Sequence, residues 1–370
     1  RQRDGTIRES GEIADGDSAP LTSAEITIPY TIPEDAQSGD EFFLNVSFVT
    51  KTATSWCEAG HEVAKEQFEL VFDGMDADRA LDTEDMESFA DGALQETDTD
   101  VTISQDNWSV SFDKETGALV SFQSDGKEMV AEGLLPNYWR AYTDNDAKES
   151  VDANWKKAND DAVVENVQVT PSDKVIYVTV DRRLPNCSDS RDSLTYTVYS
   201  SGDVIVKSTL VPATGMGELL RVGNRIQLDG SLENMTWYGR GESDSYSDRK
   251  AGYDVGVYES TVSDQFTKFL YPQETGNKTD VRFMALTDAE GNGLLVDAVD
   301  PLLSMSALHY IQEDLEQAGH IHELEGTENT VVTIDYAQMG LGTASCGPAA
   351  LPQYRLPASQ NYTYTYSLKA

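Results

Sequence analysis

The chain is predicted to be an all-β protein, and three observations predict this class. Stretches that alternate apolar and polar residues, rich in β-branched and aromatic side chains, recur from residue 24 to residue 368. Turn sequences such as Asp125-Gly126 and Ser201-Gly202-Asp203 separate them. Helical periodicity is scarce, and we expect one short helix at most, from Thr83 to Phe89.

The alternating stretches predict strands in both halves of the chain. In chain order the expected strands include Ala24–Ile32, Phe42–Val49, Val101–Ile103, Val175–Val180, Leu194–Tyr199, Val204–Leu210 and Tyr362–Leu368. Between the second and third, Asp91–Asp100 is polar and acidic and predicts a linker. We therefore expect two domains, 1–97 with a small sandwich and 98–370 with a single large one.

The charge excludes several classes of partner. With 65 acidic and 27 basic residues the formal net charge is -38. Such an excess repels phosphate backbones and anionic lipid, so we expect no nucleic-acid or membrane partner. The acidic residues are interpreted as a solvated surface, and the chain has no apolar run long enough to span a bilayer.

The sequence offers few residues in patterns that would bind a metal or act as a nucleophile. Cys57, Cys187 and Cys346 are odd in number and widely spaced, which fits neither a disulfide framework nor a zinc pattern. His320-Ile-His322 offers two imidazoles without a third ligand at a telling spacing. Gly239-Arg-Gly241 is not followed by a helix pattern, so a dinucleotide loop is a weak interpretation. We expect no metal or other cofactor in this chain.

One polar-aromatic cluster is more informative. Asn137-Tyr-Trp-Arg-Ala-Tyr-Thr-Asp-Asn-Asp146 combines aromatic rings, a guanidinium and three adjacent amide or acid groups. Rings and paired hydrogen-bonding groups suit a sugar-binding surface. A structural corner, in which Arg140 ties down a loop through the acids, is an equally good interpretation on residue types alone.

This cluster resembles the Phe-Trp-Arg-Ala-Pro-Thr-Asp-Asn-Asp signature in the last domain of glycoside hydrolase family 2 β-galactosidases. Further segments resemble the same domain, in the same order. They are Phe112–Leu119, Trp237–Gly241 with Tyr246–Arg249, Tyr271–Glu274 with Gly276–Lys278, and Gln338–Gly342 with Cys346-Gly-Pro348. Thr52–His61 is similar to a stretch of the immunoglobulin-like domain that follows the catalytic barrel. The resemblance covers nearly the whole chain.

The resemblance implies a fold and a division of labour. The fold would be an immunoglobulin-like β-sandwich, then a large antiparallel super-sandwich like that of galactose mutarotases. Because Arg1–Ile13 resembles the middle of the sandwich domain, we expect that domain to be incomplete, with a strand edge or an apolar face left open. The catalytic glutamates and the magnesium ligands belong to a preceding barrel, so none is assigned to this chain.

The family's last domain lines one side of the active-site mouth. Carried over by motif, the candidate substrate-binding residues are Trp139, Arg140, Asp144, Asn145, Asp146 and Cys346. Cys346 stands where the family has a tryptophan that stacks on the sugar, and a thiol supplies no ring face; Tyr354 is a candidate replacement. Two other departures are Asp244, in place of a glutamate, and Thr275, in place of an asparagine.

The sequence thus predicts the C-terminal part of a β-galactosidase, which binds carbohydrate but is not itself catalytic. The complete enzyme would hydrolyse terminal β-D-galactosides by the retaining two-carboxylate route. A free-standing carbohydrate-binding module and a mutarotase-like enzyme with its own acid and base are the alternatives. The expected partners are a β-galactoside, the preceding barrel domains and further copies of the chain in a homo-oligomer, and the expected location is the cytoplasm.

Overall fold

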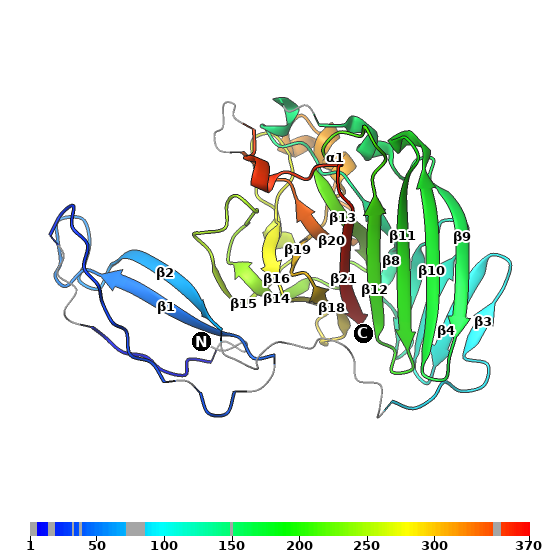
Figure 1. Cartoon of the computed structure of the whole chain (residues 1–370), viewed down its shortest axis with the longest axis horizontal. Helices are drawn as coiled ribbons and strands as arrows, with labels where there is room; N and C mark the ends of the chain where they lie inside the picture. Colours follow the sequence, from blue (N-terminus) through cyan, green and yellow to red (C-terminus); the bar gives the residue numbers. More distant parts are fainter. Residues whose placement is uncertain are drawn as a thin grey trace. The chain divides into compact units, whose positions relative to one another are not determined.

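The chain forms two compact units, Arg1–Ala80 and Leu81–Ala370. The computed structural model describes residues 6–13, 19–31, 33–36, 39–71, 86–148, 151–342 and 349–370. The described part of the first unit contains one antiparallel hairpin, β1 (Phe42–Val49) and β2 (Glu62–Leu70) (Figure 1). In this hairpin Leu44 lies opposite Phe68. The strand expected at Phe42–Val49 is therefore confirmed.

Two local predictions for the N-terminal part were wrong in their described residues. Ala24–Thr31 forms no strand, although its residues alternate, because no neighbouring segment pairs with it. The helix expected at Thr83–Phe89 falls partly outside the described residues, and Met86–Phe89 has no helical turn. Period-2 alternation indicates a strand only where a partner supplies the ladder hydrogen bonds.

The second unit is a sandwich of two large antiparallel sheets, nine- and ten-stranded among the described residues (Figure 1). The nine-stranded sheet runs in the order β15 (Asp254–Thr261), β14 (Asn234–Gly241), β17 (Phe283–Thr287), β18 (Gly293–Asp300), β21 (Tyr362–Lys369), β12 (Val204–Val211), β11 (Ser190–Tyr199), β10 (Val175–Leu184), β9 (Val163–Pro171). The ten-stranded sheet runs in the order β16 (Lys278–Val281), β19 (Leu303–Leu308), β20 (Thr330–Gln338), β13 (Arg221–Leu228), β8 (Val130–Asn137), β6 (Leu119–Ser124), β5 (Trp108–Asp113), β4 (Asp100–Gln105), β3 (Leu94–Glu96), with β7 (Lys127–Glu128) beside β6.

The all-β class and the antiparallel sandwich are confirmed. The expected strands of this unit lie within β4, β10, β11, β12 and β21. Asp125 and Gly126 both have positive φ between β6 and β7, as a two-residue hairpin turn requires. The linker expected at Asp91–Asp100 was wrong, because β3 lies within it and pairs with β4. This pairing makes β3 part of the large sheet, and the compact units divide between Ala80 and Leu81 rather than at residue 97.

The core lies between the two sheets. Along β11 and β21 every second residue is buried, and these residues face the other sheet. The rings of Phe112 and Tyr196, one from each sheet, lie 4.7 Å apart. By contrast β13 and β19 are buried at nearly every position, which shows that the outer face of the ten-stranded sheet is covered as well. That outer face carries the polar residues of the candidate site.

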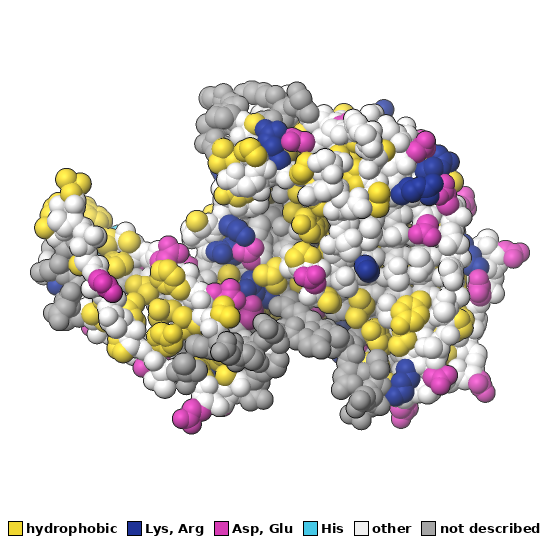
Figure 2. All heavy atoms as spheres, viewed as in Figure 1, with side chains coloured by type: hydrophobic (Ala, Val, Ile, Leu, Met, Phe, Trp, Pro, Cys, Tyr) yellow, Lys and Arg dark blue, Asp and Glu magenta, His cyan; other side chains and the backbone are white. Residues whose placement is uncertain are grey.

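Short helices connect the strands. They are α1 (Gln312–Gln317) and the 3-10 turns η1 (Asp146–Lys148), η2 (Ala153–Lys157), η3 (Pro185–Cys187), η4 (Ser263–Gln265), η5 (Ile321–Glu323) and η6 (Pro352–Tyr354). In the described parts of the chain, none of the helices has the length and apolar character needed to cross a membrane. Acidic side chains are scattered over the visible surface, with groups of Lys and Arg between them (Figure 2).

The hairpin of the first unit carries two exposed phenylalanines. Phe48 and Phe68 are each about half exposed, beside the partly buried Leu44 and Val46. We predict that the double substitution Phe48→Ser and Phe68→Ser reduces self-association of the chain, because exposed apolar strands pair with one another. Sedimentation velocity over a concentration series measures this. The prediction would be contradicted if the double variant and the wild-type chain showed the same distribution of sedimentation coefficients over this series.

Candidate functional site

The segment after β8 is closed by a buried ion pair. Arg140 Nε lies 3.0 Å from Asp146 Oδ2, and Arg140 Nη2 lies 2.8 Å from Asp146 Oδ1. The backbone N–H of Thr143 donates to the same carboxylate at 2.9 Å. Burial alone would lower the pKa of Arg140, but Asp146 together with Glu274 and Tyr246 outweighs burial and raises that pKa above its ordinary value. The guanidinium therefore stays charged, and the segment forms a fixed corner.

This corner holds the base of a loop that is distant in sequence. Arg140 donates to the carbonyl oxygens of Met339, at 2.5 Å, and Gly340, at 3.3 Å. Asn145 Nδ2 donates to Leu341 O at 2.6 Å. Cys346 follows in the sequence and lies outside the described residues. Two of the motif residues thus fix the backbone of residues 339–341, which with Gly342 are called the loop base.

A second motif segment fixes the same backbone from another side. Asp248 accepts hydrogen bonds from the backbone N–H groups of Leu341, at 3.0 Å, and Gly342, at 2.8 Å. The carbonyl of Tyr354, the candidate replacement for the stacking ring, accepts from Gly340 N at 2.8 Å. Tyr246–Arg249 stands out as a motif in the sequence, but no local signal there indicates its role in holding the loop.

The remaining candidate residues point elsewhere. The indole of Trp139 is buried, and its Nε1 donates to Glu316 of α1 at 2.7 Å. Asp144 is exposed, with its backbone N–H donating to Gln273 Oε1 at 3.3 Å. Of the six candidates, then, Arg140, Asn145 and Asp146 gather at the loop base and Asp144 faces solvent. The burial of Arg140 and Asp146 favours the positioning role over direct contact with a sugar.

A buried charged cluster, which the sequence did not reveal, adjoins this corner. Arg221 Nη2 lies 2.6 Å from Glu274 Oε1, and Arg221 Nε lies 3.2 Å from Asp335 Oδ2. Gln338 Nε2 donates to Glu274 at 3.2 Å, and Gln338 Oε1 accepts from Arg140 at 3.4 Å. Burial raises the pKa of Asp335 to about 7, against the lowering effect of Arg221 and with a further rise from Glu274.

The departures from the family pattern meet one another. Asp244 Oδ2 accepts from Thr275 Oγ1 at 2.9 Å and from the backbone N–H of Gly276 at 2.8 Å. Lys278 is fully buried beside them, with its Nζ 4.0 Å from Asp244 Oδ1 and 5.1 Å from the centre of the Trp237 ring. Burial lowers the pKa of Lys278, and the negative charge of Asp244 partly offsets that lowering.

Metal-binding chemistry finds no support in the described residues, where no group of three or more His, Cys, Asp and Glu side chains could hold an ion. His320, just before η5, and His322, within η5, are exposed beside Glu323. As a whole, this arrangement can hold the backbone of residues 339–342 in place. Its exposed edge, at Asp144, offers polar groups to a ligand.

Comparisons with known proteins identify the class of protein to which this fold and site belong. The family model described as "Beta galactosidase small chain" matches residues 104–368, and that described as "Beta-galactosidase, domain 4" matches residues 1–71. The chain belongs to the β-galactosidase small-chain family, and the resemblance found in its motifs is confirmed.

Curated relatives named β-galactosidase agree. That of Priestia megaterium (strain DSM 319 / IMG 1521) is 33% identical over 98% of this chain and 35% of its own length. Those of Streptococcus thermophilus and Kluyveromyces lactis are each 28% identical, over 93% and 94% of this chain and 33% and 34% of their own lengths. The chain thus spans about a third of the relatives it matches. A putative aldose 1-epimerase of Escherichia coli K12 shows a TM-score of 0.38 at 11% identity, over 72% of this chain and 97% of that one, a likeness too low to inform function.

The closeness of Gly340 to Asp248 yields a prediction on stability. A Cβ at Gly340 would lie 2.7 Å from Asp248 Cγ and 3.0 Å from Tyr354 Cβ. Gly340→Ala should therefore lower the free energy of unfolding by about 1–3 kcal/mol, as urea denaturation would show. Gly252→Ala is the matched control, because no atom lies within 4 Å of its Cβ position. Equal losses in the two variants would contradict the tight packing of the loop base.

The raised pKa of Asp335 yields a prediction on pH. From about pH 4 to about pH 7 the unfolded chain has lost this proton and the folded chain keeps it, so stability falls as pH rises, by up to about 1.4 kcal/mol per pH unit. Asp335→Asn removes this contribution. The free energy of unfolding of the variant, relative to that of the wild type, should therefore increase as pH rises through that range. Chemical denaturation at several pH values measures it, with the exposed Asp98→Asn as control. Parallel wild-type and Asp335→Asn curves would refute it.

Proposed function

We propose that this chain is the C-terminal part of a β-galactosidase and forms one edge of its active-site mouth. In this proposal a preceding barrel supplies the two catalytic carboxylates, which hydrolyse terminal β-D-galactosides through a glycosyl-enzyme intermediate. In this proposal the described residues hold one backbone segment in place. Arg140, Asn145 and Asp248 bind the backbone of residues 339–342 by hydrogen bonds. This convergence of three family motifs on the base of one loop is the observation that carries the proposal.

The physical reason for such a base is precision. A loop that contacts substrate acts usefully only when its backbone is held to a fraction of an ångström. Hydrogen bonds from a buried guanidinium and to a carboxylate are among the stronger ones in proteins. Asp144 is the exposed member of the segment, and in this proposal it contacts a sugar hydroxyl. The magnesium expected in the barrel, the cytoplasmic location and the role of Cys346 stay predictions.

The mutarotase-like alternative requires a histidine free to act as acid or base at a sugar site. His309 Nε2 lies 2.7 Å from Glu233 Oε2, and its Nδ1 lies 2.9 Å from Asn329 O. Both ring nitrogens are therefore engaged within the fold. His320, just before η5, and His322, within η5, are exposed beside Glu323. The engagement of His309 therefore favours the β-galactosidase proposal.

Hydrolysis of a chromogenic β-galactoside tests the proposal. We predict that the purified 370-residue chain gives no turnover, whereas a longer polypeptide that also contains the preceding part of the gene does. In that longer polypeptide Asp144→Asn should raise KM more than it lowers kcat, because a lost contact to a hydroxyl weakens binding.

The control for this experiment is Glu115→Gln, an exposed carboxylate in the turn after β5. It makes the same change of charge away from the 137–146 segment. Turnover by the 370-residue chain alone that disappears when one of its own carboxylates is substituted would overturn the proposal.

A further inference from the structure

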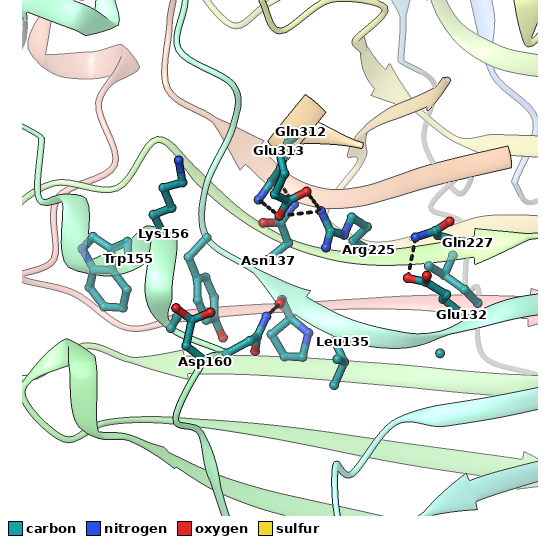
Figure 3. A pocket seen from close by; sticks show the side chains of 16 residues that line it. Glu132, Leu135, Asn137, Trp155, Lys156, Asp160, Arg225, Gln227, Gln312 and Glu313 are labelled. Atoms are coloured by element: carbon teal, nitrogen blue, oxygen red, sulfur yellow. Dashed lines mark hydrogen bonds and ion pairs between the residues drawn. The ribbon is translucent and has the colours of Figure 1, made fainter. Parts of the chain in front are cut away.

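A cavity of about 170 Å³ lies against β8 and β13 of the ten-stranded sheet, and none of its lining residues belongs to the loop base (Figure 3). Its wall is built from β8 and β13, from η2 with the residues after it, and from α1. The polar side chains that line it include Glu132, Asn137, Lys156, Asp160, Arg225 and Glu313. Segments that are far apart in sequence thus bring hydrogen-bonding groups to one hollow.

These groups are held in place by contacts with one another. Arg225 Nη1 lies 3.1 Å and 2.8 Å from the two carboxylate oxygens of Glu313. Asn137 Nδ2 donates to Gln312 Oε1 at 3.1 Å, and Gln227 donates to Glu132 (Figure 3). Such mutual hydrogen bonds fix side chains before a ligand arrives and so reduce the entropy lost on binding.

The charges of the lining point to a neutral ligand. Three carboxylates (Glu132, Asp160 and Glu313) face two cations (Lys156 and Arg225), so the hollow is nearly balanced. In a chain of net charge -38, an anionic ligand such as a phosphate would find little attraction there. The wall offers both donors and acceptors, and a hydroxyl group, which both donates and accepts, suits either kind.

The floor and the size narrow the ligand further. Leu135, Pro136 and Tyr138 give the hollow an apolar side, which would lie against the C–H face of a sugar ring. The volume equals that of about six water molecules at ~30 Å³ each, which is room for one pyranose ring and not for a long oligosaccharide.

We propose that this cavity is a saccharide-binding site for one pyranose unit, separate from the active-site mouth. Carboxylate and guanidinium groups would bind its vicinal hydroxyls in pairs. The site adjoins the mouth in sequence, because Asn137 and Tyr138 line it and Trp139–Asp146 follow directly. Glu316 of α1 binds both Trp139 and Lys156, so the wall of the cavity and the corner segment share a support. The cavity would bind sugar whether or not the chain serves the proposed β-galactosidase function.

Titration of the 370-residue chain with D-galactose, followed by saturation-transfer NMR and calorimetry, tests the proposal. We expect saturable binding at one site, in the millimolar range typical of a small polar ligand. Glu132→Gln removes one charged acceptor at the exposed rim and should weaken binding about tenfold. Asp160→Asn is a second variant of the same kind, and thermal melting confirms that each variant is folded.

Two control variants distinguish this cavity from the active-site mouth. Glu115→Gln makes the same charge change outside the cavity and should leave binding unchanged, and Asp144→Asn reports on sugar bound at the mouth. Binding that is lost in Asp144→Asn and kept in Glu132→Gln would place the sugar at the mouth, which overturns this inference and leaves the proposed function standing. Absence of saturable binding would also overturn the saccharide site. Displacement of galactose by spermidine would overturn it in favour of a cation site.

Discussion

The guanidinium of Arg140 is the group on which the geometry of the candidate site depends. Removing a charge from water costs several kcal/mol even after the protein relaxes. Here that cost is offset because Asp146 accepts from two of its nitrogens and the carbonyls of Met339 and Gly340 accept from the guanidinium as well. A lysine could not replace it, since a single ammonium group cannot present the same planar fork to a carboxylate and two carbonyls.

From this guanidinium the buried charges extend across the outer face of the sheet. Gln338 links Arg140 to Glu274, and Glu274 pairs with Arg221, which lies beside Asp335. Gly223, opposite Asp335 in the register, has no side chain there, and a Cβ would lie 1.8 Å from the carboxylate. Motifs separated by as many as 200 residues in sequence are thus parts of one network of hydrogen bonds. A network of this kind is stable only when nearly all its members are present, because one missing partner leaves a buried charge uncompensated.

The sequence predicted β4, β10, β11, β12 and β21 because each buries one face, and burial of one face produces alternation. It failed at Ala24–Thr31, which alternates without a pairing partner among the described residues, and at Leu94–Glu96, which pairs although two of its three residues are polar. For the site, residue types in 137–146 left two interpretations open. What distinguishes them is the burial of Arg140 and Asp146, which residues about 200 positions away produce, and no local pattern contains that information.

The pairing of Asp244 with Thr275 shows how the departures from the family pattern are accommodated. Aspartate is one methylene shorter than the glutamate it replaces, and threonine offers a hydroxyl where asparagine offers an amide. Together they meet, because the threonine hydroxyl and the Gly276 N–H both reach the carboxylate. The carboxylate also remains the nearest anion to the buried Lys278, whose other neighbour is the face of Trp237. Two departures that look independent in the sequence therefore keep a single buried cation compensated, and the site can vary in residue type while its charge arrangement is preserved.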